Sequence, residues 1–125
     1  MGKRIITVFA AVMLSLALAA CSSEDVSGSA AERVEAAGDE REVLIQGGNF
    51  YFDSEEYHVS VDEAVKIIYQ DIEGAHGIHI ANTNIRLRNN ESVVVKFREP
   101  GRYKITCSLY CGVGHTSMTA YLVVE

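Results

Sequence analysis

The sequence predicts an all-β domain, a small antiparallel sandwich, over residues 43–125. Three observations favour it. Short runs of β-branched and aromatic residues recur at roughly ten-residue spacing, turn residues stand between them, and apolar and polar side chains alternate within them. Regularly spaced short strands with turn signals are typical of two packed antiparallel sheets.

In chain order, the expected strands begin with residues 43–45 and 50–52, on either side of a Gly-Gly pair. Further strands are expected at residues 57–61, 65–71 and 77–80. In the strand expected at 92–98, alternation places Val93, Val95 and Phe97 on one face. Glu99-Pro100-Gly101 predicts a turn. The last strands are then expected at residues 102–106 and 118–124.

The N-terminus has the pattern of an export signal. It has a basic start at Lys3-Arg4, an apolar run over residues 5–20, and the ending Leu18-Ala19-Ala20-Cys21. The run is shorter than the ~20 residues that a comfortable membrane span needs. Residues 1–20 are therefore predicted to be a cleaved signal peptide, with a retained anchor helix as the alternative. The ending resembles the lipobox of bacterial lipoproteins, which implies lipidation of Cys21 and a lipid-anchored place on the extracytoplasmic face of the cell membrane.

Residues 21–42 are expected to be the lipidated cysteine and a flexible acidic tether, because Ser, Gly and Ala separate a run of acids and residues 22–42 contain no aromatic residue. Loss of the signal would lower the count of Lys and Arg from 11 to 9 against 17 Asp and Glu, so the formal charge of −6 becomes −8. An acidic surface suits a basic electron donor such as a c-type cytochrome and disfavours nucleic acid.

Once the signal and the lipidated cysteine are set aside, every sulfur lies in one short loop. Cys107, Cys111 and Met118 form the pattern C-x-x-x-C-x-x-x-H-x-x-M together with His115. Thiolate, imidazole and thioether are soft donors that select copper over magnesium, calcium or manganese. A single thiolate is typical of a mononuclear blue-copper site. Two thiolates four residues apart can instead bridge two copper ions, so a binuclear centre is predicted.

The loop pattern has three other interpretations. One stripe of a helix is disfavoured because Gly112 and Gly114 would each cost a helix about 1 kcal/mol. A disulfide between the two cysteines is possible in an exported protein, yet it explains neither His115 nor Met118. Zinc rarely takes thioether, and its structural sites usually use C-x-x-C pairs.

A second imidazole has to come from elsewhere, and His58, His76 and His79 are the candidates. His58 alternates with apolar neighbours and is interpreted as a surface strand residue. His76 and His79 are three residues apart, so in a strand they point to opposite faces and do not both reach one metal. Spacing alone leaves the choice between these two open.

The stretch His76-Gly-Ile-His-Ile-Ala-Asn-Thr-Asn-Ile85, followed by Pro100-Gly-Arg-Tyr-Lys-Ile-Thr-Cys107 and the copper loop, resembles the CuA domain of cytochrome c oxidase subunit II. The pattern is most similar to that of B-type haem-copper oxidases. The resemblance implies a cupredoxin-like Greek-key sandwich and two copper ions. The ligand set that it implies is His76, Cys107, Cys111, His115, Met118 and the backbone carbonyl of Leu109.

The resemblance further implies electron transfer from a c-type cytochrome toward subunit I of a haem-copper terminal oxidase. The chain is not expected to be catalytic alone, because it shows neither a haem ligand set nor spanning helices. Many relatives have Glu where Leu109 stands, so no magnesium site is expected. No Trp is present to receive electrons, which leaves Tyr110 or Tyr69 as substitutes. The alternative function is a copper chaperone that delivers copper to an oxidase through the same cysteines.

Overall fold

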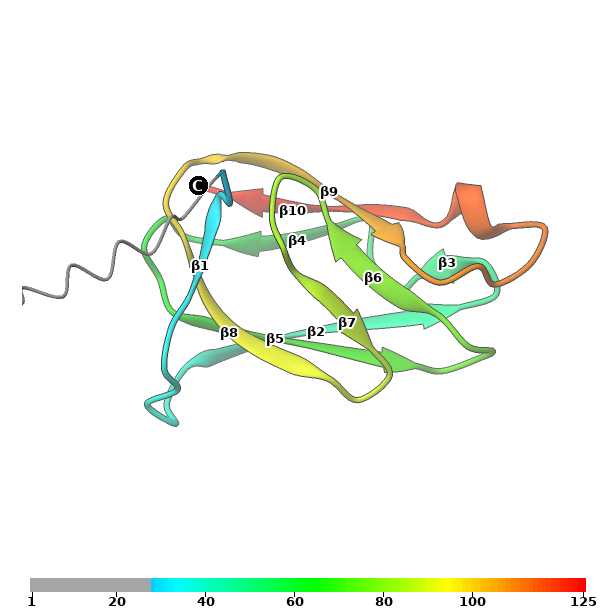
Figure 1. Cartoon of the computed structure of the whole chain (residues 1–125), viewed down its shortest axis with the longest axis horizontal. Helices are drawn as coiled ribbons and strands as arrows, with labels where there is room; N and C mark the ends of the chain where they lie inside the picture. Colours follow the sequence, from blue (N-terminus) through cyan, green and yellow to red (C-terminus); the bar gives the residue numbers. More distant parts are fainter. Residues whose placement is uncertain (1–27) are drawn as a thin grey trace, which may run out of the picture.

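The computed structural model describes residues 28–125, which form two packed five-stranded sheets (Figure 1). The strands of the first sheet, in spatial order, are β1 (Ala31–Arg33), β8 (Ser92–Phe97), β5 (Val65–Asp71), β2 (Arg41–Gly48) and β3 (Tyr51–Phe52). Those of the second are β4 (Glu56–Val59), β10 (Thr119–Val124), β9 (Gly101–Cys107), β6 (Gly77–Ile80) and β7 (Arg86–Arg88). A single 3₁₀ turn, η1 (His115–Ser117), precedes β10.

The predicted signal peptide, the lipidation of Cys21 and the first part of the tether lie outside the described residues. Within residues 28–125, no helix has the length and apolar character needed to cross a lipid bilayer.

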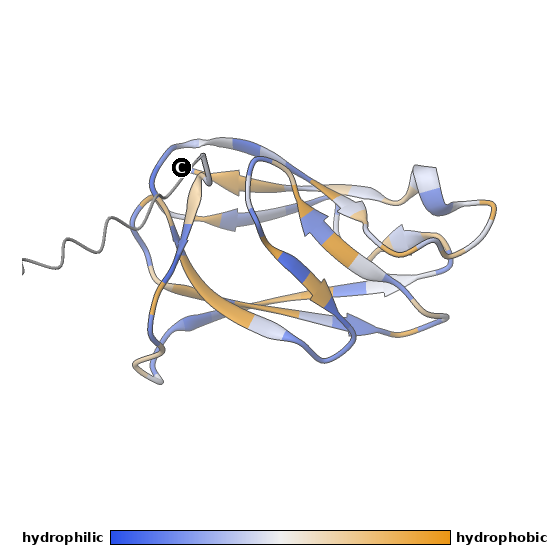
Figure 2. Cartoon of the chain, in the orientation of Figure 1, coloured by the Kyte–Doolittle hydropathy of each residue, from blue (hydrophilic) through white to orange (hydrophobic). Residues whose placement is uncertain are grey.

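Alternation along the strands builds the core between the sheets, as the sequence predicted. In β8, Val93, Val95 and Phe97 are buried and the residues between them are more exposed. The same alternation brings Ile67 from the first sheet and Ile105 from the second into the core, both with no exposed surface. Figure 2 shows apolar and polar segments alternating along the strands of both sheets. Each fully buried side chain of this kind contributes about 1.5–3 kcal/mol.

The fold begins earlier in the chain than residue 43, where the sequence placed the start of the domain. β1 pairs with β8 so that Ala31 lies opposite Phe97, and Ala31 is buried. Only one small apolar residue of this edge strand faces the core, so its composition does not differ from that of a tether. β7 was not predicted for a similar reason, because Leu87 is its single buried residue and stands between two arginines.

The sandwich that the sequence predicted as antiparallel also contains two parallel strand pairings. β2 pairs in parallel with β5, and β10 pairs in parallel with β4. A parallel pair requires the chain to cross over before it returns. Between β2 and β5 the chain passes through β4, which belongs to the other sheet. This crossover is a property of the topology that strand spacing does not reveal.

An ion pair links the start of β2 to the connection between β4 and β5. Arg41 Nε and Nη2 lie 2.9 and 3.0 Å from the two carboxylate oxygens of Glu63, and the Ser60 backbone N–H donates to Glu63 Oε2 over 3.0 Å. The Arg41 hydrogen bond, and after it the Ser60 N–H, lower the pKa of Glu63 to about 2 from an ordinary value of 4.5. A lowered carboxyl pKa stabilises the fold above pH 4.5, and this contribution is lost as the pH falls from about 4.5 to about 2.

We therefore expect Glu63→Gln to lower the free energy of unfolding at pH 7 by about 1 kcal/mol or less, because the pair is partly exposed and screened by solvent. Thermal unfolding across the acid range measures the effect, and the gap between wild type and variant should close toward pH 2. Glu55→Gln is the matched control, since the Glu55 carboxylate has no ion-pair partner among residues 28–125. A gap that widens on acidification would contradict the assignment.

Candidate metal centre

Four parts of the chain meet at one end of the sandwich, the end away from the C-terminus (Figure 1). They are the β2–β3 turn, the segment before β6, the end of β9 and the loop into β10. The β6–β9 pairing sets Ile78 opposite Cys107, which brings His76 beside the start of the loop. The β9–β10 pairing sets Thr106 opposite Thr119, so that Cys107 and Met118 follow as neighbours.

The loop gathers its sulfur and imidazole groups around Cys111. The Sγ atom of Cys111 lies 3.6 Å from Cys107 Sγ, 3.6 Å from His115 Nδ1 and 3.7 Å from Met118 Sδ. Cys107 Sγ lies 2.9 Å from the backbone oxygen of Leu109. All five residues that the sequence singled out in the loop are therefore brought together.

Two of the alternative interpretations of the loop disagree with this geometry. Cys107 and Cys111 are free cysteines, and their 3.6 Å separation is well beyond the ~2.05 Å of a disulfide. The loop contains only the short 3₁₀ turn η1, so the four side chains do not form a stripe on one helix.

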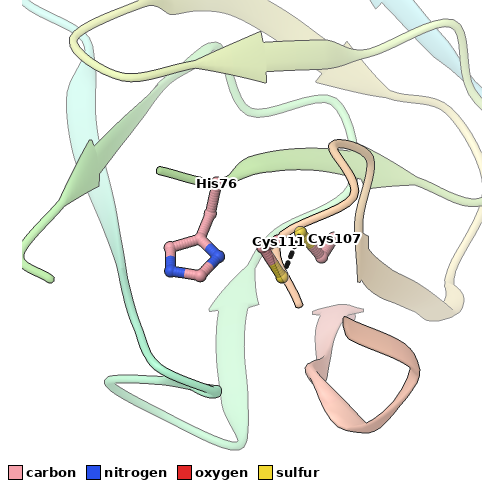
Figure 3. A group of neighbouring side chains, drawn as sticks. All are labelled: His76, Cys107 and Cys111. Carbon is pink, nitrogen blue, oxygen red and sulfur yellow. Dashed lines mark hydrogen bonds between the residues drawn. The ribbon is translucent and has the colours of Figure 1, made fainter. Parts of the chain in front are cut away.

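His76 completes the cluster from the segment before β6. A ligand atom of His76 and the sulfurs of Cys107 and Cys111 all lie within 4.8 Å of one another. Figure 3 shows the imidazole with one ring nitrogen turned toward the sulfurs. The side chain is buried, and its Nδ1 is a buried polar atom without a hydrogen-bond partner.

The other two candidate histidines lie elsewhere. His79 Nε2 is 3.3 Å from the backbone oxygen of Thr83, and His79 is not among the described residues that cluster around the cysteines. His58 lies on β4 between the carboxylates of Glu56 and Glu125. Of the three histidines, the structure brings only His76 to the two thiols.

These residues fit copper. A buried acceptor nitrogen without a partner normally costs free energy, and a metal ion bound at Nδ1 would remove that cost. Thiol, imidazole and thioether converge on the same space, which is the donor chemistry that copper prefers. In the metal-free protein, burial and then the hydrogen bond with Cys107 raise the pKa of the Cys111 thiol to about 11. Copper must therefore displace this proton to bind the sulfur as a thiolate.

Phe50 packs beneath the loop and joins it to His76. The Phe50 and His76 rings meet edge to face, with centroids 6.3 Å apart. A Cβ added at Gly114 would lie closer than 3.0 Å to three atoms of the Phe50 side chain, and one added at Gly112 would meet its ring at 3.2 Å. The two glycines thus let the loop lie directly on the aromatic ring.

No family model matches the chain. Cytochrome c oxidase subunit 2 of Thermus thermophilus is 30% identical over 82 residues, which cover 61% of this chain and 61% of that protein. A chain of a heme-copper terminal oxidase dimer, solved by cryo-EM, is 32% identical and superimposes with a TM-score of 0.59 over 81% of this chain and 75% of that one. This chain belongs to the cytochrome c oxidase subunit II family. It spans less than two thirds of the length of the curated family members that it matches.

The fold comparison agrees with the all-β prediction. The periplasmic domain of subunit II of the Bradyrhizobium japonicum cytochrome oxidase superimposes with a TM-score of 0.64 at 14% identity, over 75% of this chain and 88% of that one. At that identity the likeness concerns the fold alone, and the subunit II domain described here is a cupredoxin-like sandwich.

Three residues around the candidate centre of this subunit II domain were not predicted. Asp71 Oδ1 accepts from the backbone N–H of His76 at 3.1 Å and from the Tyr69 hydroxyl at 2.8 Å, which holds the segment before β6. Asn49 and Phe50 in the β2–β3 turn contact His76 directly. A sequence signal exists only for Asp71, an acid at the end of a strand just before the Gly-rich bend.

Proposed function

We propose that the chain is an electron-transfer module of the subunit II type, which holds two copper ions and acts on the extracytoplasmic side of the membrane. The observation that carries the proposal is the unpartnered, buried Nδ1 of His76 beside two free thiols. A mononuclear blue-copper site uses one thiolate, whereas this site offers two thiols together with the imidazoles of His76 and His115.

In the proposed arrangement, Cys107 and Cys111 would supply thiolates to both ions, and His76 and His115 would each hold one of them. Met118 and the carbonyl of Leu109 would be weak ligands that tune the reduction potential. Bound copper would supply one-electron oxidation and reduction, with no bond made or broken in a substrate.

The protein itself fixes the positions of these ligands and shields most of them from water. Cys107, Met118 and His76 are 7%, 1% and 2% exposed, and each is held at the end of a strand or just before one. Ligands fixed by strand pairing change position little when the charge of the site changes. This rigidity keeps the reorganisation that accompanies electron transfer small.

Electrons are proposed to cross the loop surface. His115 is partly exposed, and its ring lies 5.5 Å from that of Tyr110, which is 79% exposed. Tyr69 has no exposed surface, so of Tyr69 and Tyr110 only Tyr110 can meet a partner directly. The formal charge of −6 favours a basic donor such as a c-type cytochrome through long-range attraction. The proposed acceptor is subunit I of a haem-copper oxidase, with a lipid anchor at Cys21 keeping the domain near the membrane.

Electron paramagnetic resonance of the copper-loaded chain, with copper counted in parallel, tests the proposal. Two coppers per chain and hyperfine splitting shared by two equivalent nuclei are expected. One weakly held copper with a single-nucleus signal would contradict it and favour copper delivery, in which the same cysteines act as exchangeable ligands.

Met118 provides a second test of the ligand roles. We expect Met118→Leu to shift the reduction potential while both copper ions stay bound, since a weak thioether ligand tunes the site without holding it together. Leucine keeps most of the buried volume, so the free energy of unfolding should change by less than about 1.5 kcal/mol. Voltammetry and copper counting measure the two effects, and loss of the two-nucleus signal would rule out the weak-ligand role.

A further inference from the structure

We propose that Asn49 and Glu73 are positioning residues for His76, which hold its imidazole so that Nδ1 faces the sulfurs. The inference rests on the proposed function, because it treats His76 as a copper ligand. It assigns a role to two polar residues of separate loops, one in the β2–β3 turn and one between β5 and β6.

The hydrogen bonds at the far side of the ring determine where its proton lies. His76 Nε2 is 2.9 Å from the backbone oxygen of Glu73 and 3.0 Å from Asn49 Oδ1. A backbone carbonyl can only accept a hydrogen bond, so Nε2 carries the proton and donates. In the neutral ring, Nδ1 then keeps its lone pair, which is the form a metal requires.

The Glu73 side chain determines which end of the Asn49 amide faces the imidazole. Asn49 Nδ2 donates to Glu73 Oε1 over 3.0 Å. Because a carboxylate only accepts, the opposite orientation would set the amide oxygen against the carboxylate and the amide N–H against the imidazole N–H. The pair Asn49 and Glu73 therefore presents an acceptor to Nε2 and holds it there.

Gly74 leaves the space in which these groups meet. A Cβ at this position would lie 2.5 Å from Asn49 Oδ1 and 2.9 Å from His76 Nε2. Its φ of +77° is also a conformation that favours glycine. Any residue other than glycine at position 74 would therefore push apart Asn49 and the His76 ring.

The positions of the three residues set the size of the expected effect. His76 is 2% exposed, whereas Asn49 and Glu73 lie at the surface and cover the outer edge of its ring. Partners of a ligating histidine typically contribute 10–100-fold to metal affinity. Since solvent reaches Asn49, we expect the lower end of this range, about tenfold.

The test uses the full chain and three variants. Asn49→Ala removes the side-chain acceptor and leaves only the backbone oxygen of Glu73 at Nε2. The double variant Asn49→Asp with Glu73→Gln reverses the pair. The new carboxylate at position 49 accepts from His76 Nε2, and the new amide at position 73 donates to that carboxylate. Asn84→Ala is the matched control, since Asn84 is exposed and its side chain makes no hydrogen bond within residues 28–125.

The first measurement needs no copper. Proton and nitrogen NMR of the metal-free chain should show a His76 Nε2–H signal that exchanges slowly with water in wild type and in Asn84→Ala. It should exchange much faster in Asn49→Ala and slowly again in the reversed pair. An Asn49→Ala variant that exchanges as slowly as wild type would overturn the proposal.

The second measurement uses the copper-loaded chain. Copper should pass to a chelator about tenfold faster from Asn49→Ala than from wild type, and the reversed pair should restore retention. A carboxylate acceptor at Nε2 makes the imidazole a more basic ligand, which donates more electron density to copper. The copper centre of the reversed pair should therefore have a lower reduction potential than that of wild type. An unchanged release rate in Asn49→Ala would overturn the positioning role even with a two-copper signal in wild type. Absence of that signal in wild type would overturn the proposed function instead. The NMR exchange rates would still show whether Asn49 holds the Nε2–H of His76.

Discussion

Cys111→Ser is expected to abolish the two-copper centre and leave at most one weakly held ion. The Cys111 sulfur is the atom around which the cluster is arranged, within 3.7 Å of Cys107 Sγ, His115 Nδ1 and Met118 Sδ. A serine hydroxyl is a hard donor that stays protonated, so it can neither bridge two copper ions nor offset their charge. Copper counting and electron paramagnetic resonance would record the loss.

The fold should survive this change. Cys111 lies in the loop and is only partly buried against the core, so we expect the free energy of unfolding of the metal-free variant to differ from that of wild type by about 1 kcal/mol or less. Ser108→Ala, in the same loop, is the control for replacing an exposed side chain there. A Cys111→Ser protein that still binds two copper ions with an unchanged spectrum would refute the bridging role.

The second large effect is expected from Gly114→Ala, a change of one methyl group. The added Cβ would lie closer than 3.0 Å to the Phe50 side chain, so either the ring or the loop must move. Overpacking of this kind costs about 1–3 kcal/mol. Because Gly114 precedes His115 and Phe50 touches His76, the displacement reaches both imidazoles. We expect lower thermal stability together with reduced copper retention.

The neighbouring residue and a double variant make this prediction specific. Val113 is 96% exposed, so Val113→Ala in the same loop should leave both stability and copper retention unchanged. Adding Phe50→Gly to Gly114→Ala removes all three colliding side-chain atoms, and copper retention should recover relative to Gly114→Ala alone. If Gly114→Ala behaves as Val113→Ala does, the contact with Phe50 does not shape the loop.

Much of the sandwich could be predicted because strand signals are local. The strands expected at residues 65–71 and 77–80 coincide with β5 and β6, since β-branched residues recur within both. β1 and β7 could not be predicted, because each buries one residue and gains its stability from a neighbouring strand. The parallel pairings of β2 with β5 and of β10 with β4 depend likewise on how the chain crosses between the sheets.

The candidate site divides in the same way. Sequence alone determined which donor atoms the loop offers. Cys107, Cys111, His115 and Met118 lie within one short stretch, so their soft donor atoms are close together in any compact loop. The selection of His76 from three histidines was decided by the tertiary structure, through the β6–β9 register that sets it beside Cys107. Asn49 and Phe50 were likewise brought to the site by folding, from a turn far away in the sequence. The physical reason is distance along the chain: a ligand pattern within one loop is constrained by local geometry, whereas contacts between distant segments exist only once the two sheets have packed.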